Sequence, residues 1–569
     1  MRRAARAAGT SGTSIHRQSS GISDTLCPVP ATHDGAAQFT GLMQIALGRR
    51  PLTIDEVVAV ARHDATVVID TEALAAMAAT RAIVEGLADD TEPHYGISTG
   101  FGALATTHIP VEKRAELQRS LVRSHAASSG PEVEREVVRG TMLLRLQTLT
   151  TARTGARPIV AETYAAVLNA GLTPIVGEYG SLGCSGDLAP LAHCALAVMG
   201  EGTVRDARGA LMPAAQALAA AGIEPVALRE KEGLVLINGT DGMLGMLALA
   251  LTDLDRLVAT ADLAAGLSVE ALLGTDRPFA ADLLALRAHP GQATSAEDLR
   301  RVLSGSAVVA SHRPGDDGTH DCTRVQDAYS LRCAPQVHGA VRDTMAHAAA
   351  VANRELASAI DNPVVTLDGR VESNGSFLGA PLGYVLDFLA IAVADLASMS
   401  ERRTDRFLDA SRSQGLPPFL AHDPGVDSGH MIAQYTQAGI VSELKRLAVP
   451  ASVDSIPSSA MHEDHVAMGC SAARKLRRAI DGLTRVVAIE LLTAARGLDL
   501  RCAALGVASA PATAAVVAAL REHVDGPGPD RYLAPRDRAR RAAHRRRHAA
   551  RGRPGRHRDP LDPPTGEQP

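Results

Sequence analysis

Long amphipathic segments are the feature that most constrains the fold of this chain. Each carries an apolar residue every three or four positions with charged residues between, which is the period of an α-helix. The segments are 111–149, 243–273, 340–360, 381–406 and 465–498. Trp is absent and aromatic residues make up only 2% of the chain, so small and unbranched side chains must fill the core. These features predict a mainly α fold built as a bundle of long helices.

The predicted folded body covers residues 43–535, because no Gly/Ser-rich linker or short repeat divides it. Residues 1–42 are rich in Arg, Ser and Gly and have no acid before Asp24, so we expect a disordered extension. It is either a transit-like leader or the product of a start codon placed too early. Residues 536–569 form a basic, Pro-rich tail with eleven Arg against Asp537 in 536–558, and a reading-frame shift or an appended tail would explain it.

Composition also narrows the class of protein. The seven cysteines contain no CxxC pair, which argues against a disulfide framework and favours a reducing cytosol. No run of 18 uncharged apolar residues is present, so we expect no membrane partner. The net charge of the chain outside 536–558 is about −15, which is the total of −5 minus the +10 of that segment. We therefore expect no nucleic-acid partner.

The most informative motif reads GEYGSLGCSGDLAPLAH, from Gly177 to His193. Its glycines permit tight backbone geometry around Cys184, Ser185 and Gly186, just before a helix that can begin near Asp187. If the Gly186 nitrogen is pressed onto the Cys184 carbonyl carbon, ring closure and dehydration of Ser185 would leave an electrophilic methylidene. The alternative is an ordinary Gly-rich turn that caps the helix. A serine-hydrolase elbow is excluded, because GxSxG requires Gly at position 187.

The segment GSLGCSGDLAPLAH resembles the signature of the aromatic amino acid lyase family, and the resemblance extends over about 51–535. In that family the triplet, usually Ala-Ser-Gly, cyclises to 4-methylideneimidazol-5-one (MIO), with no metal. The resemblance therefore implies an MIO formed from Cys184, Ser185 and Gly186, with the N-terminal part to about residue 240 bearing it and a helical bundle beyond. It also implies a bundle of the fumarase and aromatic amino acid lyase type, assembled as a homotetramer with shared active sites.

Family resemblance assigns roles to further residues. Tyr95, in HYGISTGFG, matches the base that removes a β-proton from the substrate, a role that requires an environment favouring phenolate. Arg332 can hold a substrate carboxylate through two parallel hydrogen bonds. The remaining predicted substrate-binding residues are His125, Asn238, Gln326, Tyr329, Phe377 and Glu463.

Substrate choice rests on two of these residues. His125 and Glu463 match positions that face an imidazole ring in histidine-specific members. The resemblance thus implies that L-histidine loses ammonia to give trans-urocanate, the first step of histidine degradation, in the cytoplasm. One alternative is another MIO enzyme, an ammonia lyase or aminomutase acting on tyrosine or phenylalanine. The other is a non-catalytic homologue.

Several positions depart from the family pattern. Relatives usually carry other residues where this chain has Ser376, Leu378, Leu444 and His462, so these substitutions bear on the level of activity. The segment HEDH around His462 would also suit a metal, but His462 and His465 are three apart rather than the four of HExxH, so we expect no metal. Fumarase-type lyases share the helical architecture, but their signature loop is different and is not found in this sequence.

Overall fold

The structure is a computed structural model, and it describes residues 43–313 and 324–533. The chain divides into two units, 1–42 and 43–569, and all of the described residues belong to the second. The predicted N-terminal extension and the predicted basic tail lie outside the described residues.

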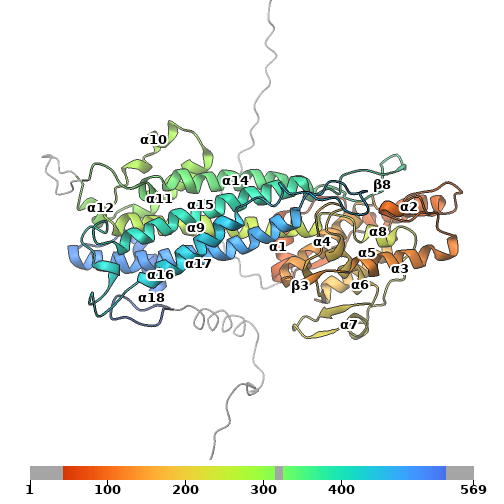
Figure 1. Ribbon diagram of the computed structural model, residues 1–569, viewed down its shortest axis with the longest axis horizontal. Coiled ribbons are helices and arrows are strands. Elements are labelled where there is room, and N and C mark those ends of the chain that lie inside the picture. The colour runs from red at the N-terminus through yellow and green to blue at the C-terminus, as the bar shows by residue number, and fades with distance from the viewer. Residues whose placement is uncertain (1–42, 314–323, 534–569) are drawn as a thin grey trace, which may run out of the picture. The chain divides into compact units, whose positions relative to one another are not determined.

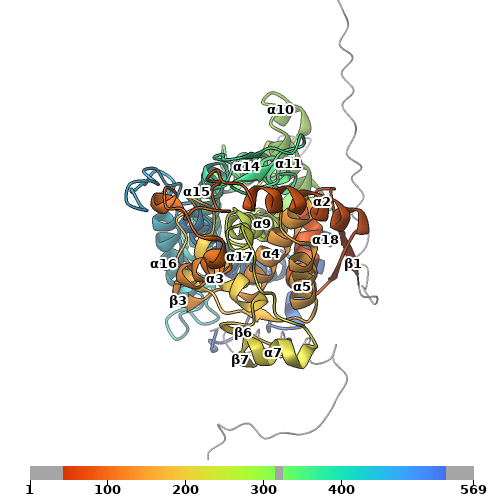
Figure 2. The same cartoon turned by 90° about the vertical axis from the view of Figure 1, so that its right-hand side faces the viewer.

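A bundle of long helices forms the centre of the second unit (Figure 1). Helices α9 (Asp241–Ala271), α15 (Ala380–Leu408) and α17 (Gly469–Leu505) pack against one another, and α14 (Ala334–Leu356) packs against α9 and α15. Helices α11 (Pro290–Leu303) and α16 (Met431–Leu447) flank them. Viewed along the bundle, α9 and α17 lie near its centre (Figure 2). This confirms the predicted mainly α fold with long helices.

The part before α9 is assembled from shorter helices and very short strands. Its helices are α1 (Ile54–His63), α2 (Thr71–Ala88), α3 (Arg114–His125), α4 (Arg135–Thr150), α5 (Pro158–Asn169), α6 (Leu188–Val198), α7 (Ala214–Ala221) and α8 (Glu232–Val235). Its strands are β1 (Gln44–Leu47), β2 (Thr66–Ile69), β3 (Ser129–Glu132), β4 (Thr173–Pro174), β5 (Gly177–Tyr179), β6 (Thr203–Arg205) and β7 (Leu211–Pro213). Strands β1 and β2 pair in parallel, β3 with β5 antiparallel, and β4, β6 and β7 form an antiparallel sheet.

Short elements connect the long helices. They are α10 (Ala281–Ala285), α12 (Ala307–Ala310), α13 (Tyr329–Arg332), the paired strands β8 (Val364–Val365) and β9 (Val371–Glu372), and α18 (Pro511–Arg521).

The predicted continuous helix over 111–149 is wrong. The structure has α3 and α4 there, separated by β3. Gly130 adopts φ +92, a left-handed conformation, and Pro131 has no backbone N–H to donate, so the helix cannot continue through this pair. The break lets β3 pair with β5, which leads into the triplet Cys184–Gly186.

Apolar residues cluster in two regions along the bundle. The larger cluster runs from β1 and α4 along α9, α15 and α17, and a second cluster around Phe279 and Phe407 lies near the C-terminal ends of these helices. Helix α15 is the described helix that is long and apolar enough to cross a membrane by length and composition. Its apolar stretch is mostly buried against α14, α16 and α17, as expected for a core helix.

Candidate functional site

The triplet lies where four helices begin. Helix α6 starts directly after it, and the Gly379 N–H at the start of α15 donates to the Gly183 carbonyl at 3.0 Å. A Cβ placed on Gly183 would lie 3.0 Å from the Gly469 nitrogen at the start of α17, and 3.3 Å from Sδ of Met243 in the first turn of α9. Helix N-termini carry partial positive charge, so the triplet sits in a field that favours negative charge.

Gly186 is held against Gly239 in a way that only glycine permits. Gly186 adopts φ +75, and the two glycines form an isolated parallel bridge. The Asp187 N–H donates to the Gly239 carbonyl at 2.7 Å. A Cβ on Gly186 would lie 2.0 Å from the Gly239 oxygen, far inside any real contact. The backbone of Gly186 therefore packs directly against that of Gly239, with no room for a side chain at position 186.

A buried guanidinium supports Gly239 from the other side. Arg145 is fully buried on α4, and a Cβ on Gly239 would lie only 1.6 Å from its Nη2. The Nη1 atom of Arg145 donates to the Val235 carbonyl at 2.9 Å, and its Nε donates to Oδ2 of Asp241 at 3.1 Å. Arg145 and Asp241 thus pin the turn between α8 and α9 beneath the triplet.

Asn238 lies in that turn and contacts the triplet directly. Its Nδ2 donates to the Ser185 carbonyl at 3.2 Å, while its buried Oδ1 accepts no hydrogen bond from the described residues. The four residues of α8, which precede this turn, are all buried. The structure thus brings Asn238, a predicted substrate-binding residue, into contact with the triplet.

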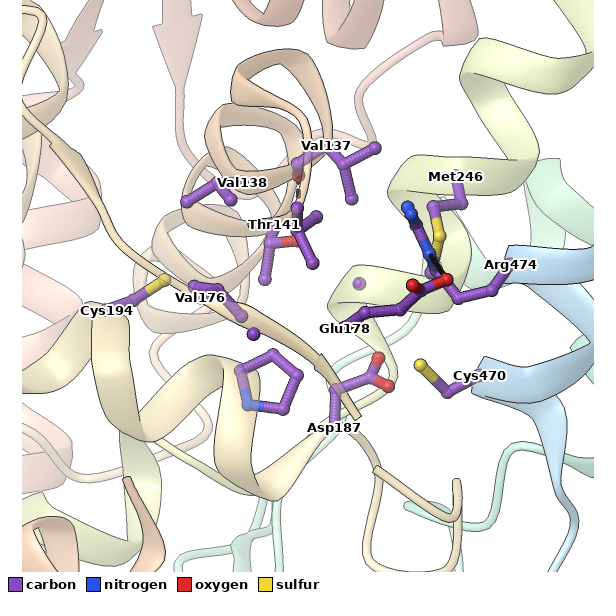
Figure 3. Close-up of a pocket in the computed structure, with 14 residues that line it drawn as sticks. Val137, Val138, Thr141, Val176, Glu178, Asp187, Cys194, Met246, Cys470 and Arg474 are labelled. Carbon is purple, nitrogen blue, oxygen red and sulfur yellow. Dashed lines mark hydrogen bonds and ion pairs between the residues drawn. The ribbon is translucent and has the colours of Figure 1, made fainter. Parts of the chain in front are cut away.

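Asp187 follows the triplet directly and is fully buried. Its carboxylate accepts from the Ser181 hydroxyl at 2.8 Å and from the Met243 N–H at 2.9 Å. Complete burial raises the pKa of this carboxyl to about 6, against these two hydrogen bonds. Asp187 faces Cys470 across a small, mostly apolar cavity (Figure 3), whose lining includes Met246 and Cys194.

Glu463 accepts hydrogen bonds from two side chains of the triplet. Its Oε1 accepts from the Ser185 hydroxyl at 3.1 Å, and its Oε2 accepts from the Cys184 thiol at 3.2 Å and from the Ser458 hydroxyl at 2.8 Å. Burial, together with the nearby Glu463 carboxylate, raises the pKa of the Cys184 thiol to about 12.

Tyr95 lies in a loop that approaches the Glu463 loop. Its hydroxyl accepts from the Gly102 N–H at 3.1 Å, and its ring meets Phe101 edge-on at 6.2 Å between centroids. A Cβ on Gly102 would lie 2.8 Å from Oγ of Ser459, so the two loops touch. Burial raises the pKa of Tyr95, and Glu463 adds to the rise, so the residues of this chain do not favour phenolate.

His125 and Phe377 lie on α3 and on the segment before α15, respectively. His125 is the last residue of α3, and its Nδ1 lies 2.9 Å from the Leu121 carbonyl, so Nδ1 carries the proton and Nε2 is left as an acceptor. Phe377 is half-buried, two residues before Gly379. Ser376 and His462 are exposed. Leu444 is buried in the contact between α16 and Gly482 of α17.

Gln326, Tyr329 and Arg332 lie at the other end of the bundle. Arg332 pairs with Gln326 and lies over the Tyr329 ring at 4.8 Å from its centroid. The nearby Asp327 accepts from the Thr275 N–H, just past the C-terminal end of α9. Helix α9 has 31 residues, so its two ends are about 46 Å apart. Within one chain, Arg332 cannot meet the triplet.

Sequence reasoning missed three residues around the triplet. Arg145, Asp241 and Gly239 all support it, and none was singled out in the sequence. One available signal was Arg145 itself, an arginine within the apolar run MLLRL of α4. A charge inside such a run requires a buried partner.

No group of three or more His, Cys, Asp or Glu suited to a metal occurs among the described residues. His465, one of the two histidines considered as ligands, has its Nδ1 3.1 Å from the Ser455 hydroxyl. The absence of a metal remains a prediction.

Comparisons with known proteins agree on one family. The model of the family described as "Aromatic amino acid lyase" matches residues 52–522. A histidine ammonia-lyase from Streptomyces griseus is 64% identical over 492 residues, covering 86% of this chain and 94% of its own. One from Sorangium cellulosum is 48% identical, covering 85% and 94%.

Solved structures of the same fold include enzymes with different named activities. Histidine ammonia-lyase from Trypanosoma cruzi matches with a TM-score of 0.78 and 36% identity, covering 86% of this chain and 91% of its own. Tyrosine aminomutase from Streptomyces globisporus matches with a TM-score of 0.81 and 38% identity, covering 86% and 94%. Fold similarity alone therefore does not separate the two activities.

Proposed function

The chain belongs to the aromatic amino acid lyase family, and we propose that it eliminates ammonia from L-histidine to give trans-urocanate. The observation that carries the substrate choice is the 64% identity to a histidine ammonia-lyase over 94% of that protein, against 38% for the tyrosine aminomutase. Glu463, which accepts a hydrogen bond from Ser185, and His125 at the end of α3 are side chains that can bind an imidazole, and they support the same choice.

Residues around the triplet fit the MIO group that the family implies. The space at Gly186 is filled by the Gly239 backbone, so a residue with a Cβ is excluded at the position whose nitrogen has to close the ring. Asn238 would hold the group through the Ser185 carbonyl, which remains part of the ring. When formed, the MIO supplies an electrophile for the substrate amine, which makes that amine a better leaving group.

The other side chains bind and orient the substrate or move its proton. Tyr95 takes the β-proton on its phenolic oxygen, which in this chain accepts a hydrogen bond from Gly102 N–H. Since burial raises the pKa of Tyr95, its base form requires a positive group near the phenol in the assembled, substrate-bound site. The Asn238 amide donates toward the Ser185 carbonyl, where it stabilises negative charge on that oxygen.

Glu463 and His125 recognise the imidazole ring. Glu463 accepts from the Ser185 hydroxyl in the unmodified chain, so loss of that hydroxyl on dehydration leaves Oε1 free to accept from an imidazole N–H. His125 offers Nε2 as an acceptor. Phe377 contributes an aromatic wall from the segment before α15.

Arg332, with Gln326 and Tyr329, holds the substrate carboxylate in a site shared between subunits. Because about one helix length separates Arg332 from the triplet of its own chain, a second copy has to supply it. We therefore extend the proposal to a homotetramer. Unpartnered apolar side chains support assembly, among them Tyr384, Phe388 and Ile391, which recur at i, i+4 and i+7 on α15.

The protein is also proposed to act in the cytoplasm. All five cysteines of the described residues are free thiols, as expected for a reducing compartment. We propose an amino acid as its small-molecule partner, with neither nucleic acid nor membrane.

The test combines product analysis with intact mass. The purified chain is incubated separately with L-histidine, L-tyrosine and L-phenylalanine, and the ultraviolet spectrum of each product is recorded. Urocanate from histidine, with a polypeptide lighter by two waters, roughly 36 Da, is the expected result. Coumarate, cinnamate or a β-amino acid alone would assign the chain to the tyrosine or phenylalanine enzymes. An unmodified mass and no product would make it a non-catalytic homologue.

A further inference from the structure

A buried arginine in the bundle core contacts the backbone of the helical turn that carries Arg332. Arg403 lies near the C-terminal end of α15, and its side chain is fully buried. Its Nη1 donates to the Ser330 carbonyl at 3.2 Å. Ser330 lies between Tyr329 and Arg332 in α13, a helix of only four residues. So short a helix gains little stability from its own hydrogen bonds, and its position depends on outside contacts.

The other guanidinium nitrogens of Arg403 are bound to one carboxylate. Its Nε donates to Oε1 of Glu490 at 2.5 Å, and its Nη2 donates to Oε2 at 3.0 Å. Glu490, fully buried on α17, also accepts from the Ser268 hydroxyl at 2.8 Å and the Ser400 hydroxyl at 2.6 Å. Four donors from α9 and α15 therefore fix the carboxylate that α17 supplies, and the planar guanidinium links that carboxylate to α13.

A buried histidine fixes the remaining side of Arg403. The Nε2 atom of His338, on α14, lies 3.5 Å from Nη1 of Arg403, and Nδ1 of His338 lies 2.7 Å from Oδ1 of Asp262. Arginine has no acceptor, so Nε2 is the unprotonated nitrogen and Nδ1 carries the proton toward Asp262. All four long helices thus contribute to the orientation of one guanidinium.

We propose that Arg403, held by Glu490, is a positioning residue for the substrate-carboxylate anchor Arg332. The inference rests on the proposed function, since it takes Arg332 to bind the carboxylate of the amino acid. The side chain of Arg403 points into the bundle core and contacts no substrate. It acts by fixing the backbone of α13, so that the guanidinium of Arg332 faces the triplet of another subunit in one orientation.

The test replaces Arg403 by lysine in the full-length protein. An ammonium group can pair with Glu490, but it cannot also span to the Ser330 carbonyl as the planar fork does. We expect the KM for L-histidine to rise about tenfold, kcat to stay within about threefold, and the two-water mass loss to be complete. Inhibition by urocanate, which has a carboxylate, should weaken about tenfold, while inhibition by histamine, which has none, should change less than twofold.

Arg501→Lys is the matched control. Arg501 is a buried arginine on α17 at the same end of the bundle. It donates to the backbone carbonyls of Ala271, Ser413 and Gln414, and none of these three is a proposed site residue. We expect it to lower the melting temperature as Arg403→Lys does while leaving KM unchanged. An equal rise of KM in both variants, or an unchanged KM in Arg403→Lys, would overturn the proposal.

A milder variant covers the case in which Arg403→Lys does not fold. Ser400→Ala removes one hydrogen bond from Glu490 without changing a charge, and we expect a KM rise of about twofold to threefold with complete mass loss. An unchanged KM there would contradict the proposal as well. If the wild-type chain produced no urocanate, the proposed function itself would have failed, whereas an active wild-type enzyme with unchanged variants refutes only the role of Arg403.

Discussion

The two ends of the bundle differ in how closely their proposed site residues are packed within one chain. At the end that holds the triplet, Gly186, Gly239, Asn238 and Arg145 belong to one chain and pack without space for a single added carbon. At the end that holds α13, Tyr329 is 70% exposed, and the contacts of Arg332 among the described residues are with Gln326 and Tyr329. The contrast supports the proposal that one chain prepares the electrophile while a second chain completes the binding of the substrate.

The largest expected effect on activity comes from a substitution within the triplet. Ser185→Ala removes the hydroxyl that must leave as water, so we expect activity to fall by roughly 10³-fold or more. Intact mass should show no loss of two waters, and the oligomer should persist in light scattering. Retained activity with the unmodified mass would show that the chain works without the ring.

Complementation tests the dependence of the other end on a second chain. Arg332→Ala alone should lower kcat/KM by about 10²-fold or more, because the carboxylate loses two charge-assisted hydrogen bonds. Co-expressed in equal amounts with Ser185→Ala, it should restore about a quarter of the wild-type activity, since mixed oligomers contain sites with both residues intact. If the two residues acted within one chain, the mixture would stay inactive.

Acidification should change the contributions of the two ends to the free energy of unfolding in opposite directions. It should lower the contribution of the end that holds α13. His430 is buried beside Thr493, and burial, with Arg496 nearby, lowers its pKa to about 4. Between pH 6.5 and pH 4 the unfolded chain binds a proton at His430 that the folded chain does not. The free energy of unfolding therefore falls by up to about 3 kcal/mol as the pH is lowered from about 6.5 to 4. Melting temperatures at pH 7 and pH 5 should differ less for His430→Gln than for wild type. Equal pH dependence would exclude His430 as the cause.

At the triplet end the sign is reversed. Burial raises the pKa of Asp187 to about 6, so between about pH 4 and pH 6 the folded chain binds a proton that the unfolded chain has lost. Above pH 6 the buried carboxylate is charged, and its burial destabilises the fold in full. Asp187→Asn should therefore raise the free energy of unfolding by up to about 3 kcal/mol at pH 7, less any loss at the hydrogen bond with the Met243 N–H, and should leave it nearly unchanged at pH 4. Thermal melts of the variant at both values measure the difference. A variant less stable at pH 7 than at pH 4, relative to wild type, would contradict it.

Much of the bundle could be predicted because its signals are local and continuous. The predicted helix over 243–273 is close to α9, whereas the predicted helix over 111–149 ignored the Gly130–Pro131 pair that separates α3 from α4. The short helix α8 is buried on every side, so no amphipathic period marks it in the sequence.

The candidate site was predictable where the chain is contiguous. The triplet and the helix after it come from one motif, and the structure has α6 beginning at Leu188. The contact of Glu463 with Ser185, across nearly 280 residues, and the support of Gly239 by Arg145 depend on tertiary packing. The separation of Arg332 from the triplet follows from helix lengths and directions, which no motif records.

The thiol of Cys184 has a consequence for the lifetime of the catalyst. A cysteine next to an electrophile could disable the enzyme by adding to it, because thiolates are strong nucleophiles. Burial and the Glu463 carboxylate raise the pKa of this thiol to about 12, so it stays protonated at neutral pH. In the proposed enzyme, the same surroundings would therefore keep the Cys184 side chain a poor nucleophile beside the electrophile.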